Sequence, residues 1–373
     1  MQKAGEFAKR FPKSWTLLEQ GVAEGVAPGF VAGIWSAGTR DQTWIGAVGS
    51  RRNQPGVLPM EVDTIFDLAS VSKLFTATLT ATLIDRGWLR WETAVAEIFP
   101  DYRFSEIRLD HLLSHTAGFI AWQPFWEKLR LKWAPRGVWE VPIRLRQRAM
   151  RELIFSLVPE VPPGTRALYS DVSSLLLGFV LEEILQLPLD RAVSDFVFSP
   201  MNLKNTYYHR IKRRPDQDIF PEVAATEDSE WRGGVLQGQV HDDNTWAMGG
   251  YAGHAGVFGT AESTLEFARR LLVGRFLKSE TLLRMWTRAD SPPGCDRTLG
   301  WDTPSGAEPS ASRAFSPRSV GHLGFTGTSL WIDLDAGIAV TLLSNRVHPS
   351  RENNLIREFR PRFHRAIREE FGR

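Results

Sequence analysis

Residues 329–344, SLWIDLDAGIAVTLLS, predict a β-hairpin near the C-terminal end of the chain. Its two arms, 329–334 and 338–344, are rich in β-branched and aromatic residues and flank the turn sequence Asp-Ala-Gly. A second pair of such arms, 30–36 and 42–48, lies near the N-terminal end. Because an isolated hairpin is only marginally stable, we expect the two hairpins to join in one antiparallel sheet.

Helical patterns flank both hairpins. Leucine and valine recur at helical spacing in residues 13–25, and residues 354–371 predict a closing helix that is interrupted at Pro361. The patterns in the middle of the chain are mostly helical. Together they predict an α+β protein, in which an antiparallel sheet flanked by terminal helices receives an inserted, mainly helical domain. The expected boundaries are residues 1–75 and 290–373 for the sheet domain and residues 76–289 for the inserted domain.

The composition is that of a globular protein without a dominant charge. Of the 373 residues, 43% are hydrophobic and 24% are charged, which excludes a disordered or low-complexity chain. The 45 Lys and Arg residues nearly balance the 43 Asp and Glu residues, so no overall field favours nucleic acid as a partner. The single cysteine, Cys295, excludes an internal disulfide and a multi-cysteine metal site. We expect no cofactor and no metal.

The N-terminal residues, MQKAGEFAKRFPKSW, lack the apolar run of a signal peptide or a membrane anchor. This predicts a cytoplasmic protein without an integral membrane segment, or a periplasmic one if a leader has been trimmed. The sequence does not indicate an oligomeric state.

The run DLASVSK, Asp67–Lys73, stands at the start of a long apolar helical pattern. Ser70 and Lys73 are three residues apart, so they would share one face of a helix. A serine hydroxyl needs a base before it can attack a carbonyl, and burial would lower the pKa of a lysine enough to accept that proton near neutrality. The same spacing also occurs in helices with an N-cap serine and a solvated lysine, so other motifs must decide between the two interpretations.

Two further motifs accompany it, and the three together resemble the serine β-lactamase and penicillin-binding-protein superfamily, specifically its class C β-lactamase-like branch. Tyr169-Ser170-Asp171 matches the Tyr-x-Asn element, and Gly321-His322-Leu323-Gly324 matches the Lys-Thr-Gly or His-x-Gly element that precedes a strand, here expected at 325–334. The likeness extends from about residue 15 to the C-terminus. It implies a β-lactamase/transpeptidase-like fold.

The resemblance also implies roles for individual residues. Ser70 would be the acylated nucleophile, Lys73 its proton partner, and Tyr169 the base that relays a proton to the leaving group. The backbone N–H groups of Ser70 and Phe325 would form the oxyanion hole. The substrate-binding residues would be Asp171, His322 and Gly324.

Two departures from the family pattern bear on the substrate. Asp171 stands where β-lactamases have Asn, and its carboxylate would favour a protonated Lys73. His322 stands where they have Lys, and a mostly neutral imidazole holds a carboxylate less firmly until it is protonated toward pH 6. We therefore expect a serine hydrolase of small-molecule esters or amides that prefers neutral short-chain acyl esters to penicillins. Open alternatives are a D-amino-acid peptidase or carboxypeptidase, a weak β-lactamase, and a catalytically degenerate protein that binds a peptide or peptidoglycan.

Several other patterns favour structural interpretations. His111 and His115 have the spacing of a metal site but no third ligand, and His241-Asp242-Asp243-Asn244 is better explained as a hydrogen-bonded loop under the cleft. The segment 122–151 combines four tryptophans with eight Lys and Arg residues. A membrane- or nucleic-acid-binding surface is one interpretation, but an amphipathic flap with its tryptophans packed inward is favoured. The arginines of 357–368 are expected on a solvated helix face.

Overall fold

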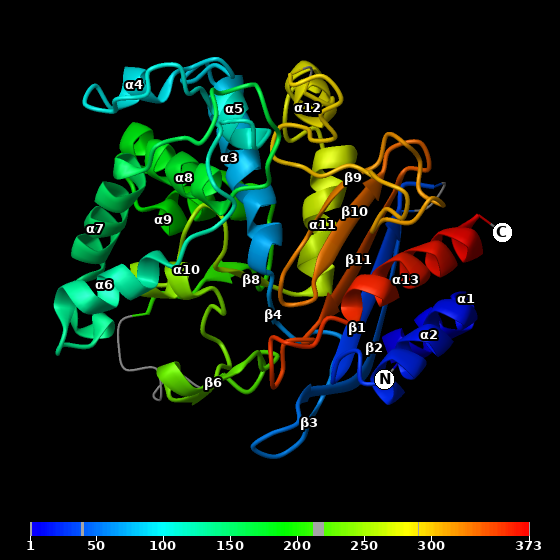
Figure 1. Cartoon of the computed structure of the whole chain (residues 1–373). Coiled ribbons are helices and arrows are strands. Elements are labelled where there is room, and N and C mark those ends of the chain that lie inside the picture. Colours follow the sequence, from blue (N-terminus) through cyan, green and yellow to red (C-terminus); the bar gives the residue numbers. More distant parts are fainter. Residues whose placement is uncertain (1, 39–40, 212–219, 290, 373) are drawn as a thin grey trace.

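The computed structural model describes residues 2–38, 41–211, 220–289 and 291–372. Its largest sheet consists of β1 (Gly29–Ser36), β2 (Gln42–Arg52), β3 (Leu58–Pro59), β9 (Val320–Leu323), β10 (Ser329–Asp333) and β11 (Ile338–Ser344). The strands are antiparallel and follow the order β3-β2-β1-β11-β10-β9 (Figure 1). Strand β1 pairs with β11, with Phe30 opposite Ser344, so the hairpins from the two chain ends do form one sheet.

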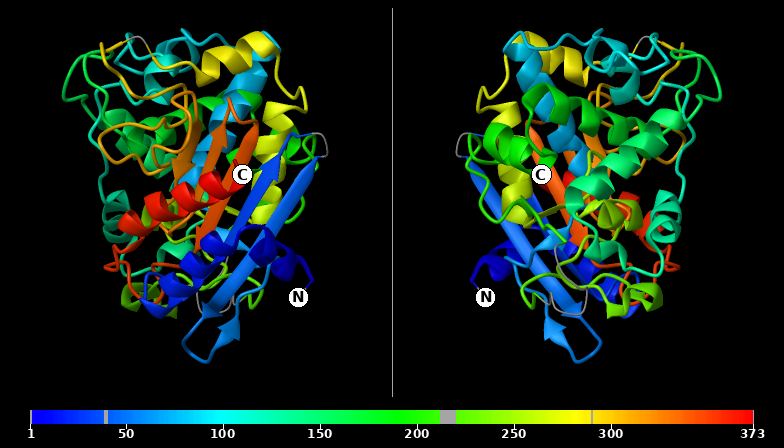
Figure 2. Two further views of the ribbon diagram at one scale, coloured as in Figure 1. Left: turned by 90° about the vertical axis from the view of Figure 1, so that its right-hand side faces the viewer. Right: turned by 90° about the vertical axis from the view of Figure 1, so that its left-hand side faces the viewer.

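Both chain ends supply helices to one face of this sheet (Figures 1 and 2). These helices are α1 (Gln2–Arg10), α2 (Pro12–Ala23) and α13 (Ile356–Phe371). Phe30 of β1 stacks on Phe359 of α13 with ring centroids 5.0 Å apart. Near the end of α13, the Glu370 carboxylate accepts hydrogen bonds from the Ser14 N–H (2.9 Å) and hydroxyl (2.6 Å) at the start of α2. The two terminal helices are therefore fastened to each other as well as to the sheet.

The expected interruption at Pro361 is wrong, because α13 continues through this residue. Phe359 and Phe363, on either side of the proline, are buried against the sheet. Packing of both flanks holds the helix together where the missing N–H would otherwise favour a break.

The opposite face of the sheet is covered by α11 (Ala261–Leu272), which packs against β1 and β11 (Figure 1). This helix lies within the residues expected to form the inserted domain. One apolar cluster joins Val31 and Leu343 of the sheet to Leu265 of α11 and continues into the helical part. The division of the chain at residues 75 and 290 thus remains a prediction, while the α+β class is confirmed.

The helical part is organised around α3 (Ser72–Asp85), in which every side chain from Ser72 to Leu83 is buried. The hydroxyls of Thr78, Thr80 and Thr82 donate to carbonyl groups four residues earlier in the same helix, at 2.8, 2.9 and 2.8 Å. Such bonds satisfy polar side chains in an apolar environment. The other helices are α4 (Val95–Ile98), α5 (Leu109–Leu113), α6 (Phe125–Trp133), α7 (Ile143–Ser156), α8 (Asp171–Leu185), α9 (Leu189–Val193), α10 (Asp243–Met248) and α12 (Ser279–Trp286).

Two short sheets lie beside these helices. The first joins β4 (Phe66–Asp67), β8 (Val257–Gly259) and β5 (Tyr207–Tyr208), and the second pairs β6 (Asp228–Ser229) with β7 (Gly234–Val235). Strand β4 leads directly into the Ser-x-x-Lys motif, so the first of these sheets fixes the entry to α3.

The strand expected at 325–334 begins later than predicted. His322 and Leu323 end β9, a turn covers 324–328, and β10 begins at Ser329. The turn closes with hydrogen bonds from Gly324 N–H to Thr328 O (2.7 Å) and from Gly327 N–H to Gly324 O (3.1 Å). The motif Gly321–Gly324 therefore lies at the end of β9 and not directly before β10.

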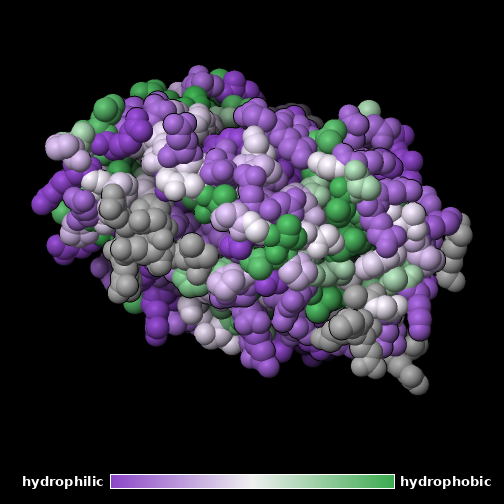
Figure 3. Space-filling view, turned by 90° about the horizontal axis from the view of Figure 1, so that it is seen from below, coloured by the Kyte–Doolittle hydropathy of each residue, from purple (hydrophilic) through white to green (hydrophobic). Residues whose placement is uncertain are grey.

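No single helix of the described residues is long and apolar enough to cross a membrane, although α8 and Leu189–Phe198 pass such a test together as a pair bent by 76°. The apolar side chains of α8 are buried in the core. On the face shown in Figure 3, hydrophobic residues lie in separate groups among hydrophilic ones.

Candidate active site

Ser70 lies in a single 3₁₀ turn, Ala69–Val71, that runs directly into α3. Ala69, the residue before it, has a φ of +48°, a left-handed conformation that costs a non-glycine residue energy. The buried Asp67 carboxylate holds this backbone by accepting hydrogen bonds from Ala69 N–H (2.9 Å) and from His241 N–H (2.6 Å). Strain directly before a proposed nucleophile, supported by a buried carboxylate, is typical of a functional site.

Lys73 extends from the first turn of α3 and is 4% exposed. Its Nζ lies 3.0 Å from Ser70 Oγ, 2.8 Å from Asp171 Oδ1 and 3.2 Å from the carbonyl oxygen of His254. Ser70 Oγ and the His254 carbonyl accept hydrogen bonds from this ammonium group, and Asp171 forms an ion pair with it. The structure thus brings Ser70, Lys73 and Asp171 together, and it excludes the solvated lysine of the alternative interpretation.

The pKa of Lys73 moves in the direction opposite to the one expected from burial. Burial by itself lowers it, but the negative charge of Asp171 at 2.8 Å and the interaction with Tyr169 outweigh burial and raise it. Burial and Asp171 raise the pKa of Tyr169 as well, although Lys73 opposes this. In the resting site Lys73 is an ammonium and Tyr169 a neutral phenol. The expectation that burial lowers the pKa of Lys73 toward neutrality is therefore wrong, whereas the expected preference for a protonated Lys73 beside Asp171 agrees with the structure.

Tyr169 lies against Lys73, whose Nζ is 4.8 Å from the centroid of the phenol ring. Arg297 approaches the ring to 5.4 Å, and the rings of His115 and His322 have centroids 4.7 and 5.8 Å away. Positive charges on the face of a phenol favour its ionised form and can thus limit the effect of burial.

The Tyr-x-Asp motif is positioned by the start of α8. Ser170 is the N-cap of this helix, and its Oγ accepts a hydrogen bond from Ser173 N–H (3.4 Å). Ser170 N–H donates to His115 Nδ1 at 3.1 Å, and burial lowers the pKa of that imidazole well below its usual value. His115 is therefore a neutral hydrogen-bond acceptor, and no group of three or more candidate metal ligands occurs in the described part of the chain.

His322 faces the same site from the end of β9. Burial and the nearby Lys73 lower its pKa to about 3, and its Nδ1 lies 2.8 Å from Leu323 O. The imidazole is thus neutral at pH 7 as expected, but it also stays neutral at pH 6. The expected gain in carboxylate binding through its protonation is therefore wrong.

The turn after His322 approaches the start of α3 closely. A Cβ on Gly324 would lie 2.0 Å from Thr328 Oγ1 and 2.6 Å from Leu68 O, so only glycine fits there. Thr328 Oγ1 in turn donates to Leu68 O at 2.9 Å. This contact places the Phe325 N–H next to the turn that carries Ser70. Across the described ranges, neither the Ser70 N–H nor the Phe325 N–H donates to another protein group.

A cavity of about 590 Å³ contains Ser70, Tyr169, Asp171 and His322 in its walls. Sequence reasoning missed that arginines contribute strongly to the same walls, and it placed part of them on a solvated helix face. The arginines of the cavity wall are Arg297, Arg346, Arg351, Arg357 and Arg360. The expectation of a solvated helix face is thus wrong for Arg360, which is buried.

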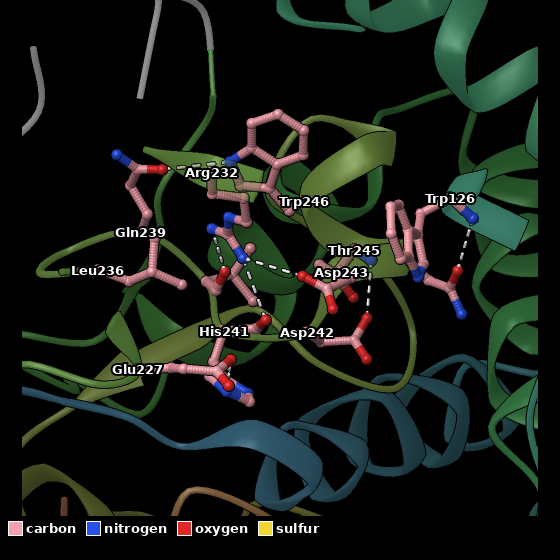
Figure 4. Close-up of polar contacts among 12 residues, drawn as sticks. Trp126, Glu227, Arg232, Leu236, Gln239, His241, Asp242, Asp243, Thr245 and Trp246 are labelled. Carbon is pink, nitrogen blue, oxygen red and sulfur yellow. Dashed lines mark hydrogen bonds and ion pairs between the residues drawn. The ribbon is translucent and has the colours of Figure 1, made fainter. Parts of the chain in front are cut away.

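The loop 241–244 forms another part of the wall and is hydrogen-bonded, as the sequence favoured (Figure 4). His241 Nε2 lies 3.1 Å from Glu227, and Asp243 forms an ion pair with the buried Arg232 at 3.4 Å. Asp242 Oδ1 accepts from Thr245 N–H at 2.7 Å, capping α10. These partners occupy the side chains that would otherwise suit a metal.

The tryptophans of 122–151 divide into two groups. Trp126 stacks on Trp231 with centroids 4.3 Å apart, and Trp133 and Trp139 are partly buried against the core. Trp122 is 49% exposed and lines the cavity. Three tryptophans are therefore packed inward as expected, while the fourth lies in the cavity wall.

Comparisons with known proteins show the family of the chain. The family model described as Beta-lactamase matches residues 16–360. The chain is 29% identical over 316 residues to a "Putative D-alanyl-D-alanine carboxypeptidase" of Salmonella agona (strain SL483), covering 77% of this chain and 70% of that protein.

Among solved structures, the chain is similar to EstCE1, described as a hydrolase with promiscuous acyltransferase activity (TM-score 0.71, 21% identity, 99% of each chain). It is also similar to a mutant of simvastatin synthase, LovD, from Aspergillus terreus (TM-score 0.72, 20% identity, 99% of this chain and 97% of that one). At these identities the structural likeness shows the fold. By its match to the family model, the chain belongs to the β-lactamase family and is a serine hydrolase.

Proposed function

We propose that this enzyme hydrolyses carboxylic esters or amides through an acyl-enzyme on Ser70. The observation that carries the proposal is the hydrogen bond of 3.0 Å between Lys73 Nζ and Ser70 Oγ inside the cavity. Tyr169, Asp171 and His322 line the same cavity, so a bound carbonyl would meet the nucleophile and the proton-transfer groups together.

The reaction needs a site that has lost one proton from the resting Lys73–Tyr169 pair. In that form the pair accepts the Ser70 proton as Oγ bonds to the carbonyl carbon, and the Ser70 and Phe325 N–H groups stabilise the resulting oxyanion. The tetrahedral intermediate then expels the alcohol or amine, which takes a proton from Tyr169. In the second half a water molecule attacks the acyl carbon and gives one proton to Tyr169. The tetrahedral intermediate then breaks its bond to Ser70 Oγ, which takes this proton back from Tyr169, and the acid and free Ser70 result.

Esters are the substrates we place first, because an ester leaving group needs less assistance by proton transfer than an amide. Peptides that end in D-amino acids are the second candidate. They are favoured by the arginines of the cavity wall, which would attract a terminal carboxylate, and by the name of the Salmonella relative.

Intact-mass measurement after incubation with a fluorophosphonate tests the nucleophile. We expect one adduct on the native enzyme and none on Ser70→Ala, with the circular dichroism spectrum of the fold retained. Turnover of p-nitrophenyl esters, D-amino-acid peptides and β-lactams then ranks the substrate classes. An adduct on another serine would contradict the assignment, and binding of peptides without an adduct would favour a degenerate binding protein.

A further inference from the structure

Two buried arginines hold the turn that carries the Phe325 N–H. Arg360, on α13, donates from Nη2 to Gly324 O (2.7 Å) and to Thr328 O (3.0 Å). Arg346, which follows β11, donates from Nε to Phe325 O (2.8 Å), and its guanidinium lies 4.3 Å from the centroid of the Phe325 ring. Both arginines also line the cavity.

These two charges lack carboxylate partners. Arg360 is 6% and Arg346 is 3% exposed, yet neither forms an ion pair with any carboxylate in the described ranges. The Arg360 Nε has no hydrogen-bond partner there either. The buried Arg232 differs, because Asp243 balances its charge. An uncompensated buried cation is costly to the fold, so it calls for an explanation.

Arg360 keeps its charge under ordinary conditions. Burial and the neighbouring Arg346 and Arg357 lower its pKa to about 9, so the guanidinium is protonated at neutral pH. Its positive potential acts on the cavity, whose wall also contains the neighbouring Arg346 and Arg357.

The acceptor of Arg360 lies in one particular peptide group. Gly324 O and the Phe325 N–H belong to the same planar amide, so a donor on the oxygen draws electron density away from the nitrogen. A charged donor does so more strongly than a neutral one. The N–H becomes a better donor on its other side, where the proposed mechanism places the oxyanion.

We propose that Arg360 is a positioning residue that makes the Phe325 N–H a stronger oxyanion donor and stabilises the oxyanion by its charge. The inference rests on the proposed function, since it needs an oxyanion in this cavity. Negative charge develops only in the tetrahedral state, so Arg360 acts on that state and little on a bound neutral ester.

The test compares Arg360→Lys with Arg360→Gln in the full-length enzyme. Both replacements can donate a hydrogen bond to Gly324 O, but only lysine carries a charge. Arg365→Gln, an exposed position on the same helix, is the control for the loss of one positive charge. The measurements are kcat and KM for p-nitrophenyl butyrate, and inhibition by phenylboronic acid, which forms an anionic tetrahedral adduct with a serine.

We expect Arg360→Gln to lower kcat by about 10- to 100-fold, less than or close to the loss of a whole oxyanion-hole donor, with KM nearly unchanged. Affinity for phenylboronic acid should fall by a similar factor. Arg360→Lys should recover most of both losses, and Arg365→Gln should match the native enzyme. A purely structural role would instead change KM, kcat and thermal stability without distinguishing Lys from Gln.

Equal kcat values and equal boronate affinities for the Lys and Gln variants overturn the inference, provided that fluorophosphonate still labels Ser70 of the native enzyme. A native enzyme that is not labelled at Ser70 overturns the proposed function, and this inference with it. The first result leaves the nucleophile in place, so the two failures can be told apart.

Discussion

Lys73 and Arg360 are both buried cations, one bonded to Ser70 in the cavity wall and the other part of that wall, but they are balanced in different ways. Lys73 has the Asp171 carboxylate at 2.8 Å, and its pKa is raised despite burial. Arg360 has the carbonyl oxygens of Gly324 and Thr328 as acceptors, and burial lowers its pKa to about 9. A carboxylate cancels a charge at short range, whereas peptide dipoles leave most of it to act on the surroundings.

The two cations therefore have different roles in the proposed reaction. Lys73 forms an ion pair with Asp171 that has no net charge, and its Nζ contacts Ser70 Oγ, so it can take part in the proton transfers of the reaction. The unpaired Arg360 is protonated at neutral pH, and it supplies a positive potential where the oxyanion forms. The predictions below test each half of this comparison.

Replacing Lys73 by arginine should have the largest effect. Arginine can keep a positive charge beside Asp171, but a guanidinium does not give up its proton at accessible pH. We expect kcat/KM for p-nitrophenyl butyrate to fall by about 10²- to 10⁴-fold, the usual contribution of a proton-transfer group. Lys278→Arg, at an exposed lysine that donates to Asp85 O, is the matched control. Activity within tenfold of the native enzyme would mean that Lys73 contributes only its charge.

Asp171→Asn should make Lys73 resemble a buried lysine without a partner. With the carboxylate gone, burial is no longer outweighed, so the pKa of Lys73 falls. The native rate should rise with pH until the Lys73–Tyr169 pair loses a proton, and this limb should move to lower pH by about one unit or more in the variant. Profiles of kcat/KM between about pH 6 and 10 measure the shift.

The control for this variant is Asp190→Asn, which removes a carboxylate that pairs with Arg210 and does not line the cavity. Its profile should coincide with that of the native enzyme. A limb that moves to higher pH in Asp171→Asn would show that the carboxylate does not hold the proton on Lys73.

His322→Lys tests whether the cavity needs a further cation for carboxylate substrates. A lysine there adds a charged donor, so kcat/KM for nitrocefin should rise by about tenfold or more while that for p-nitrophenyl butyrate changes little. In the native enzyme the pKa of His322 is about 3, so its protonation should not lower KM for nitrocefin between pH 8 and pH 6. No gain in the variant would indicate that the arginines of the wall already bind the carboxylate.

The sequence predicted the parts of the site that depend on local spacing. Ser70 and Lys73 are separated by one helical turn, and Tyr169 and Asp171 flank the N-cap of a helix, so short-range geometry places them. The joining of the two terminal hairpins in one antiparallel sheet was also predicted, because an isolated hairpin is only marginally stable. Asp171 in place of Asn already indicated a protonated Lys73, but that the carboxylate outweighs burial depends on its distance of 2.8 Å, which only the structure shows.

Arg360 was missed for a related reason. The sequence shows that it shares the apolar face of α13 with Ile356, Phe359 and Phe363, at helical spacings of three and four residues. An arginine on an apolar helix face is the sequence feature that could have indicated a buried position. Only the packing of α13 on the sheet shows that the side chain is buried and reaches the turn at Gly324.

Glu370, farther along α13, carries a buried charge that we expect to contribute to stability alone. Its carboxylate accepts from Lys13 N–H (2.7 Å), Ser14 N–H (2.9 Å) and the Ser14 hydroxyl (2.6 Å), and it is 7% exposed. Like Arg360 it is held by peptide groups, but it does not line the cavity. Glu370→Gln should lower the free energy of unfolding in urea by about 1–3 kcal/mol, because an amide cannot accept all three bonds with the strength of a charge.

The same variant should keep kcat/KM for p-nitrophenyl butyrate within about twofold of the native value, since a charge acts strongly on the reaction only where it meets the developing oxyanion. Glu369→Gln, at the exposed neighbouring position, is the control and should change neither quantity. A loss of activity in Glu370→Gln as large as that in Arg360→Gln, at unchanged stability, would contradict the comparison. The position of an unpaired charge relative to the cavity would then not decide whether it serves catalysis or the fold.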